Sequence, residues 1–287
     1  MPGVFLTADL LTGEAALAAI QGVRRACRRE DGRDPLDEAA DLLLKHHGIS
    51  GIDAWVTSDG FALRHDGSLD VAVAPRAREH GLGGALAAAA LAAPGPVTAW
   101  SHGDHPAARE LAAVHGMARA RELWVMRRST ALPLPAVALP AGVSIRGFAG
   151  ADDVPALLAV NAAAFATHPE QGSLDAAGLA ERMAERWFEA DGLLQAFDAD
   201  GSLLGFHWTK RHDADHGEVY VVGIAPQAQG RGLGRALTIA GLDHLARRGV
   251  REVHLYVEAD NAPARRLYEG LGFDHAAVDT HVQYARP

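Results

Sequence analysis

One short pattern occurs twice in this chain: an apolar run, a proline, a glycine-rich turn and then an Ala/Leu-rich stretch. The first copy, VAVAPRAREHGLGGAL, covers residues 71–86, and the second, VVGIAPQAQGRGLGRAL, covers residues 221–237. Pro75 matches Pro226, so the repeat has a period of about 150 residues, much longer than the roughly 20–50 residues of solenoid repeats. A chain built this way is expected to fold as two similar domains in tandem.

The two halves contain the same succession of expected elements: two helices, short strands, the Val-rich strand with its turn, and then a helix, a strand, a short helix and a closing strand. The helices that open the halves are expected at residues 13–29, 37–46, 151–165 and 174–188. Residues 129–142, STALPLPAVALPAG, are rich in proline and nearly uncharged, which indicates an extended linker. The sequence therefore predicts two α+β domains, at residues 1–135 and 143–287.

Composition narrows the class of protein. The chain has 287 residues, 48% of them hydrophobic, and a net charge of −9, which argues against a broad nucleic-acid surface. Its most apolar stretch, residues 84–93, is too short to span a membrane. Residues 1–11 lack a basic start, and Cys27 is the only cysteine. We expect a cytoplasmic protein that acts as a monomer on a small molecule, with no nucleic-acid or membrane partner.

The glycine turn indicates an anion site. A strand that leads through glycines into a helix exposes backbone N–H groups at the helix N-terminus, where they favour a phosphate. Neither copy has the GK[ST] ending of a P-loop, and GRGLG is one residue short of the dinucleotide-binding spacing. QGRGLG, residues 229–234, matches Q/R-x-x-G-x-G/A, the pyrophosphate-binding turn of the GNAT acetyltransferases. For one isolated copy, a plain glycine-rich turn remains the alternative.

A second motif supports the GNAT resemblance. NAPARRLYEGLGF supplies Asn261, Tyr268, Gly272 and Phe273 with the spacing typical of the end of a GNAT domain. The second half therefore resembles a GNAT domain, and HPAARELAAVHGM in the first half resembles a diverged copy. The resemblance implies two GNAT domains, each a mixed, mostly antiparallel sheet flanked by helices, with acetyl-CoA as cosubstrate and no metal.

The resemblance also implies contacts to acetyl-CoA. In the second half they are Val222, Gly223, Ile224, Gln229, Gly230, Arg231, Gly232, Leu233, Gly234, Arg235, Asn261 and Arg266. In the first half they are Val71, Ala72, Val73, Glu79, His80, Gly81, Leu82, Gly83 and Gly84.

Acetyl transfer to an amine requires a base for the amine and an acid for the leaving thiolate. By resemblance, Glu218 is the base and Tyr268 the acid, although a surface glutamate and a core tyrosine are the simpler interpretations of each residue alone. The first half has Gly67 in place of Glu218 and Ala112 in place of Tyr268. We therefore expect the first domain to bind acetyl-CoA or to be structural, and only the second to catalyse transfer.

The acceptor is suggested by four longer stretches, at residues 160–172, 203–210, 217–234 and 255–273. Together they resemble the mycothiol synthases, a family of tandem GNAT acetyltransferases. The resemblance implies direct transfer of acetyl to the cysteine amine of Cys-GlcN-Ins (1-D-myo-inosityl 2-(L-cysteinylamino)-2-deoxy-α-D-glucopyranoside). The implied substrate contacts are Glu38, Glu170, Lys210, Glu218 and Tyr256.

Several alternatives stay open. Asp37 is a rival to Glu38 because the two carboxylates are adjacent. Another amine, such as an aminoglycoside or a protein N-terminus, is the alternative acceptor, and a non-catalytic acyl-CoA sensor is the alternative function. His207, His212 and His216 offer metal ligands, but no cysteine or close carboxylate pattern completes a site.

Overall fold

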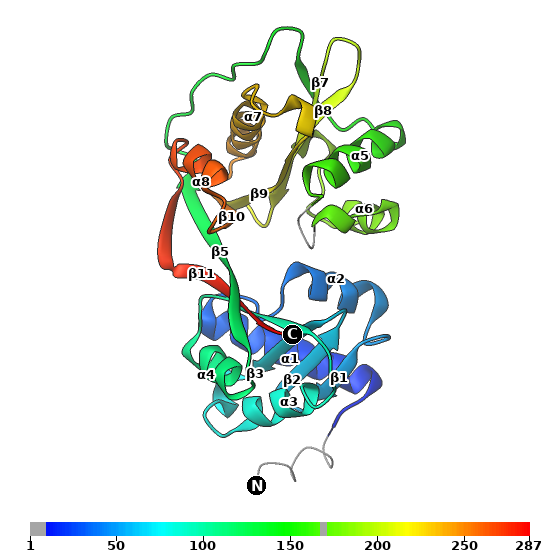
Figure 1. The fold of residues 1–287 in the computed structure, drawn as a ribbon, viewed down its shortest axis with the longest axis vertical. Coiled ribbons are helices and arrows are strands. Elements are labelled where there is room, and N and C mark those ends of the chain that lie inside the picture. Colours follow the sequence, from blue (N-terminus) through cyan, green and yellow to red (C-terminus); the bar gives the residue numbers. More distant parts are fainter. Residues whose placement is uncertain (1–9, 167–170) are drawn as a thin grey trace. The chain divides into compact units, whose positions relative to one another are not determined.

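The computed structural model describes residues 10–166 and 171–287. The chain forms two compact units (Figure 1): unit 1 contains residues up to Leu123 together with Ala277–Pro287, and unit 2 contains Trp124–Ala276. This division differs from the predicted domain ranges, because it falls inside a strand before the proline-rich segment and returns the C-terminal residues to unit 1. Among the described helices, none is long and apolar enough to cross a membrane.

Unit 1 is a sheet in the strand order β1-β2-β3-β4-β11, with helices from residues 13–114 packed on it. The strands β1, β2 and β3 form an antiparallel meander, β4 runs parallel to β3, and β11 pairs antiparallel with β4 through Val282–Arg286. The elements are α1 (Gly13–Asp31), α2 (Glu38–His47), β1 (Asp53–Val56), β2 (Gly60–His65), β3 (Ser68–Val73), α3 (Leu82–Ala90), β4 (Val97–Ser101), α4 (Pro106–Val114) and β11 (Asp274–Arg286).

Unit 2 has the strand order β5-β10-β9-β8-β7-β6. The strands β6 to β9 pair antiparallel, and β10 runs parallel to β9. The elements are β5 (Ala118–Ser129, shared with unit 1), β6 (Ser144–Gly147), α5 (Val154–Ala164), α6 (Ala176–Met183), β7 (Leu193–Phe197), β8 (Leu203–Arg211), β9 (His216–Ile224), α7 (Leu233–Arg247), β10 (Glu252–Glu258) and α8 (Ala262–Glu269).

The core of unit 2 follows from the alternation of side chains along β8. Phe206 and Trp208 are 1% exposed and pack in a cluster with Leu157 of α5 and Leu179 of α6. His207 points to the other face, where its Nδ1 lies 2.8 Å from the carbonyl oxygen of Leu237 in α7. The sheet is therefore covered by α5 and α6 on one face and by α7 on the other (Figure 1).

Candidate active site

The two glycine turns have nearly the same backbone. Gly232 precedes α7 with φ 81° and ψ 1°, and Gly81 precedes α3 with φ 82° and ψ −4°. Three residues earlier, Gln229 has φ −64° and ψ 158°, and Arg78 has φ −70° and ψ 161°. Both turns therefore lead into a helix through a glycine without a side-chain cap, the backbone arrangement that the anion-site prediction requires.

The charged side chains at the second turn leave those N–H groups uncapped. Gly232 carries no side chain that could cap α7. Arg231 lies 3.8 Å from Asp198, a loose ion pair between two partly exposed groups. The helix dipole and this arginine make the turn electropositive despite the acidic chain. In unit 1, Arg78, the counterpart of Gln229, binds Asp31 through Nη1 at 2.8 Å and Nη2 at 2.5 Å.

The strands β9 and β10 separate beside this turn. Their paired register runs from His216 with Glu252 to Val219 with Leu255, and the remaining residues of the two strands are not paired with each other. The N–H of Ala225 donates to the carbonyl of Leu204 on β8. Because successive N–H groups of a strand alternate in direction, those of Val222 and Ile224 point to the opening between β9 and β10. They are donors available to the amide and thioester groups of an extended ligand.

Glu218 lies in the paired part of β9, just before the opening. It is 6% exposed, and His254 of β10 stands directly opposite it in the register. The Nε2 of His212 is 2.7 Å from Oε2 of Glu218, and the Nε2 of His254 is 3.7 Å from the same oxygen. The rings of His212 and His254 stack with centroids 5.1 Å apart. Two imidazoles thus contact one oxygen of a buried carboxylate.

These contacts decide the charge of Glu218. Burial alone would raise the pKa of the carboxyl group, but the hydrogen bond from His212 and the charges near it, including Lys210, outweigh burial and lower the pKa. Burial lowers the pKa of His254, so this imidazole is neutral near pH 7. Glu218 is therefore an ionised, buried carboxylate, in a form that can accept a proton.

An aromatic cluster borders the carboxylate on the α5 and α6 face. Lys210 pairs with Glu218 across β8 and β9, and its Nζ lies 4.8 Å from the ring centre of Trp187 and 5.1 Å from that of Tyr220. Tyr220 is the extra residue of a β-bulge, since Val221 pairs with Trp208 while Val219 pairs with the next residue of β8. Its hydroxyl accepts a hydrogen bond from Nε of Arg182 on α6 at 3.0 Å.

Tyr268 lies on α8, in the position that the motif predicts. It packs against Phe273, with ring centroids 5.8 Å apart, and belongs to the edge of a core cluster. Burial raises the pKa of its phenol to about 12. No residue that the structure describes is hydrogen-bonded to its hydroxyl. The group therefore stays protonated at neutral pH and has a proton to donate.

The other expected contacts lie on α8, α2 and β10. Asn261 caps α8, its Oδ1 accepting the N–H of Ala264, and Arg266 is exposed on the same helix. Asp37 caps α2 by accepting the N–H of Ala40 at 2.8 Å, which leaves Glu38 at the first helical position. Tyr256 is 44% exposed on β10.

Tyr256 lies beside His254, with ring centroids 5.6 Å apart. Glu170 lies outside the described residues.

Unit 1 lacks the counterpart of the carboxylate for a simple reason. Asp66 and Gly67 have φ 45° and 77° and form a two-residue hairpin turn between His65 and Ser68. The strand that would carry a base therefore ends in a turn. At the counterpart of Tyr268, the buried Ala112 helps to line a cavity of about 80 Å³. Unit 1 thus keeps the turn but has neither predicted proton-transfer group.

The histidines considered as metal ligands are not brought together. His207 is buried against α7, where burial lowers its pKa to about 4, and His216 pairs with Asp213 at 3.0 Å. His212 faces Glu218 instead. His212, Glu218 and His254 have one potential ligand atom each within 4.8 Å of one another. In this cluster the carboxylate of Glu218 accepts the hydrogen bond from His212.

A second group of potential ligands is also engaged. Glu189, Asp191 and His244 have one ligand atom each within 4.8 Å of one another. Both carboxylates pair with Arg248, at 2.7 Å and 3.9 Å. The group is therefore an ion-pair cluster on the unit 2 surface.

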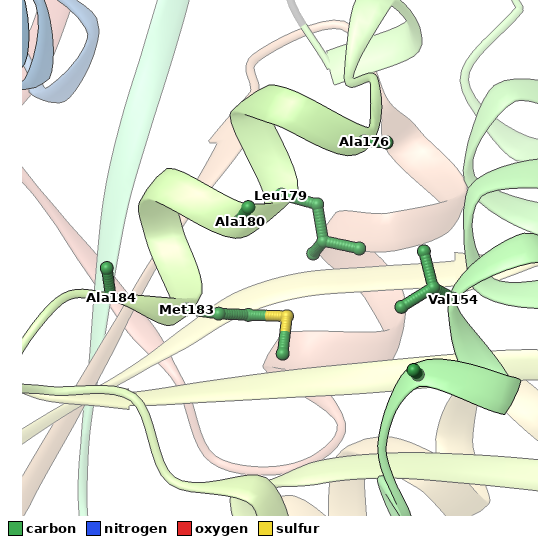
Figure 2. Close-up of a pocket in the computed structure, with 7 residues that line it drawn as sticks. Val154, Ala176, Leu179, Ala180, Met183 and Ala184 are labelled. Carbon is green, nitrogen blue, oxygen red and sulfur yellow. The ribbon is translucent and has the colours of Figure 1, made fainter.

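A larger cavity of unit 2 lies elsewhere. It has a volume of about 400 Å³ and lies between α6 and the start of α5 (Figure 2). Its walls are small or apolar side chains, with Val154, Leu179 and Met183 pointing into it. No titratable side chain lines it, so it is not suited to proton transfer.

His254 is the neighbour of Glu218 that sequence reasoning missed. It lies 36 positions further along the chain (254 minus 218) and meets Glu218 only through the parallel pairing of β9 and β10. The alternation along EVHLYVE could have shown that His254 and Tyr256 share a face, but it does not give the register between strands.

Known proteins share the sequence pattern and the fold of this chain. Residues 162–273 match the Acetyltransferase (GNAT) family. The chain is 57% identical to a mycothiol acetyltransferase of Nocardioides sp., over 94% of this chain and 97% of the relative. It is 48% identical to a mycothiol acetyltransferase of Actinosynnema mirum, over 89% of this chain and 90% of the relative.

Among solved structures, a tandem GNAT protein from the clavulanic acid biosynthesis pathway has the same fold. Its TM-score is 0.67 at 18% identity, over 97% of each chain. The fold is therefore that of two GNAT domains in tandem. Since the identity to the first two relatives is high over nearly their whole length, this chain belongs to the mycothiol acetyltransferase family of GNAT proteins.

Proposed function

We propose that this protein transfers the acetyl group of acetyl-CoA to the cysteine amine of Cys-GlcN-Ins, giving mycothiol and CoA. The observation that carries the proposal is the ionised, buried carboxylate of Glu218, which lies next to the point where β9 and β10 stop pairing. Family membership supplies the acceptor, since the relatives are mycothiol acetyltransferases. The lone cysteine of the chain suits a reducing compartment, so we place the reaction in the cytoplasm.

Each proposed role follows from a described group. The pyrophosphate of acetyl-CoA would lie at the N-terminus of α7, and the N–H groups of Val222 and Ile224 would hold its extended arm. Acetyl-CoA supplies the acetyl group as a thioester. Glu218 takes a proton from the ammonium of the acceptor, and the phenol of Tyr268 gives a proton to the departing thiolate. Lys210 and Tyr256 are proposed to donate hydrogen bonds to the hydroxyls of the acceptor.

The proposal predicts the effect of removing the base. Glu218→Gln keeps the shape of the side chain but cannot take the proton, so we expect kcat with Cys-GlcN-Ins to fall by about 10²-fold or more. The dissociation constant for acetyl-CoA should stay within about twofold, because the α7 turn is unchanged. The rate is measured by the release of CoA, and binding by calorimetry.

Three results would count against the proposal. An unchanged rate of Glu218→Gln would remove Glu218 as the base. No acetylation of Cys-GlcN-Ins by the wild-type protein, with transfer to an aminoglycoside or to a protein N-terminus instead, would favour a different acceptor. No transfer to any of these amines would favour an acyl-CoA sensor.

A further inference from the structure

The two oxygens of the Glu218 carboxylate have different surroundings. His212 and His254 both approach Oε2, at 2.7 Å and 3.7 Å. No residue that the structure describes is hydrogen-bonded to Oε1. A carboxylate that is 6% exposed therefore has one oxygen engaged by side chains and one oxygen left for another partner.

The three residues come from elements that hold them firmly. Glu218 and His254 lie opposite each other in the parallel register of β9 and β10. His212 follows the end of β8, and its own N–H donates to the carbonyl of His216 at 2.9 Å, which closes the β8–β9 hairpin. The hairpin thus fixes the imidazole of His212 relative to the strand that carries Glu218.

His212 differs from His254 in what it offers to the carboxylate. With Glu218 ionised, the Nε2–H of His212 donates a charge-assisted hydrogen bond at 2.7 Å, which is directional and strong. His254 is 3.7 Å away, beyond hydrogen-bond distance, and is held neutral by burial. Only the first contact can set the rotation of the carboxyl group.

We propose that His212 is a positioning residue for the base: it holds Oε2 of Glu218 and so presents Oε1 to the ammonium group of the acceptor. In the step itself, one N–H bond of the ammonium breaks and one O–H bond forms at Oε1. The hydrogen bond from His212 to Oε2 remains. This inference rests on the proposed function of Glu218 and adds to it a residue that does not touch the substrate.

Other charged groups face the pair. They are Lys210 on β8 and Arg127 on β5, which acts on His254 while paired with Glu252 at 3.2 Å; the titratable His254 on β10 also faces the pair but is neutral. Lys210 lies over the rings of Trp187 and Tyr220, His254 is 3.7 Å from Oε2, and Arg127 is paired with Glu252, so the structure describes no hydrogen bond from these groups to Oε2. We therefore expect loss of His212 to change the pKa of the Glu218 carboxyl even with these charges in place.

The first test is a titration of the Glu218 carboxyl by carbon-13 NMR, with Glu218→Gln to assign the signal. We expect His212→Ala to raise the midpoint by about one pH unit, since a hydrogen bond to the charged form is lost. His212→Gln, whose amide can donate from nearly the same place, should restore most of the shift. This readout needs no acceptor, so it holds even if the proposed substrate is wrong.

The second test is the pH profile of acetyl transfer. His212→Ala should lower kcat about 10-fold, leave the KM for acetyl-CoA unchanged and move the acidic limb of kcat/KM to higher pH by about one unit. His212→Gln should recover most of kcat. His216→Ala is the matched control, because His216 lies on the same hairpin and pairs with Asp213 instead, and it should behave as wild type. An unmoved carboxyl midpoint or an unchanged kcat in His212→Ala would overturn the inference.

Discussion

At the scale of single residues, burial favours the protonated form of both proposed proton-transfer groups, but the two groups end in opposite charge states. Glu218 is kept ionised because a hydrogen bond and nearby charges outweigh burial. Tyr268 has no such partner, so burial raises its pKa to about 12 and keeps it protonated. One group is therefore ready to accept a proton and the other to donate one, over the same range of pH.

Tyr268→Phe tests the second of these states. We expect kcat to fall about 10-fold or more, because the leaving thiolate loses its proton donor. Binding of acetyl-CoA should change little, since only a hydroxyl is removed. In the wild-type protein, the raised pKa means that ionisation of Tyr268 should not reduce the rate up to about pH 10. An ordinary phenol, with a pKa of about 10, would already be partly ionised in that range. A stopped-flow assay of thiol release between pH 7 and 10.5 measures both effects.

The residue scale also shows where prediction from sequence stops. Glu218, Tyr268 and Asn261 are local to motifs, and the structure has each on the expected element. His254 reaches Glu218 through strand pairing, and His212 through a hairpin whose turn is irregular. Motif spacing carries no information on either contact, because register is a property of the folded sheet.

At the scale of elements, the two glycine turns show how a sequence can drift while its backbone is kept. Glu79 has φ 65° where its counterpart Gly230 has φ 75°. A side chain in this left-handed region costs about 1 kcal/mol or more, a cost that glycine avoids. The repeat in the sequence predicted the shared turn, but it did not show that unit 1 keeps the shape under strain.

A matched pair of substitutions tests this strain. Glu79→Gly should stabilise unit 1 by about 1 kcal/mol, and Gly230→Ala should destabilise unit 2 by about the same amount. Urea unfolding, monitored by hydrogen exchange in peptides of each unit, gives the change in the free energy of unfolding of each unit. If Glu79→Gly were destabilising, a contact of the Glu79 side chain would have to outweigh its backbone strain.

At the scale of the whole molecule, the units do not follow each other simply along the chain, because Ala277–Pro287 come after unit 2 but belong to unit 1. The alternation in AVDTHVQYA predicts a closing strand, and β11 is that strand, but it is Val282–Arg286 that pair with β4 of unit 1. Alternation identifies a strand and its buried face but not the sheet it joins. The proline-rich segment suggested the boundary, whereas the contacts divide the chain within β5.

The role of the last strand can be tested at one position. Val282 is fully buried in a cluster with Leu86 and Val97 of unit 1, so Val282→Ala should cost about 2 kcal/mol. Hydrogen exchange should rise in peptides of unit 1 and stay unchanged in those of unit 2. Val278→Ala is the control, because Val278 is 66% exposed on the same strand. Equal loss of protection in both units would contradict the division.

The return of the C-terminal strand has a consequence for biosynthesis. A ribosome makes the chain from the N-terminus, and domains generally fold as they emerge. Unit 2 is complete once Ala276 has emerged, but unit 1 receives the strand that pairs with β4 only when Val282–Arg286 have emerged. We therefore expect the half that is synthesised first to mature last, only after residues 282–286 have emerged. A nascent chain stalled before Val282 would carry a finished second unit and an open edge on the first.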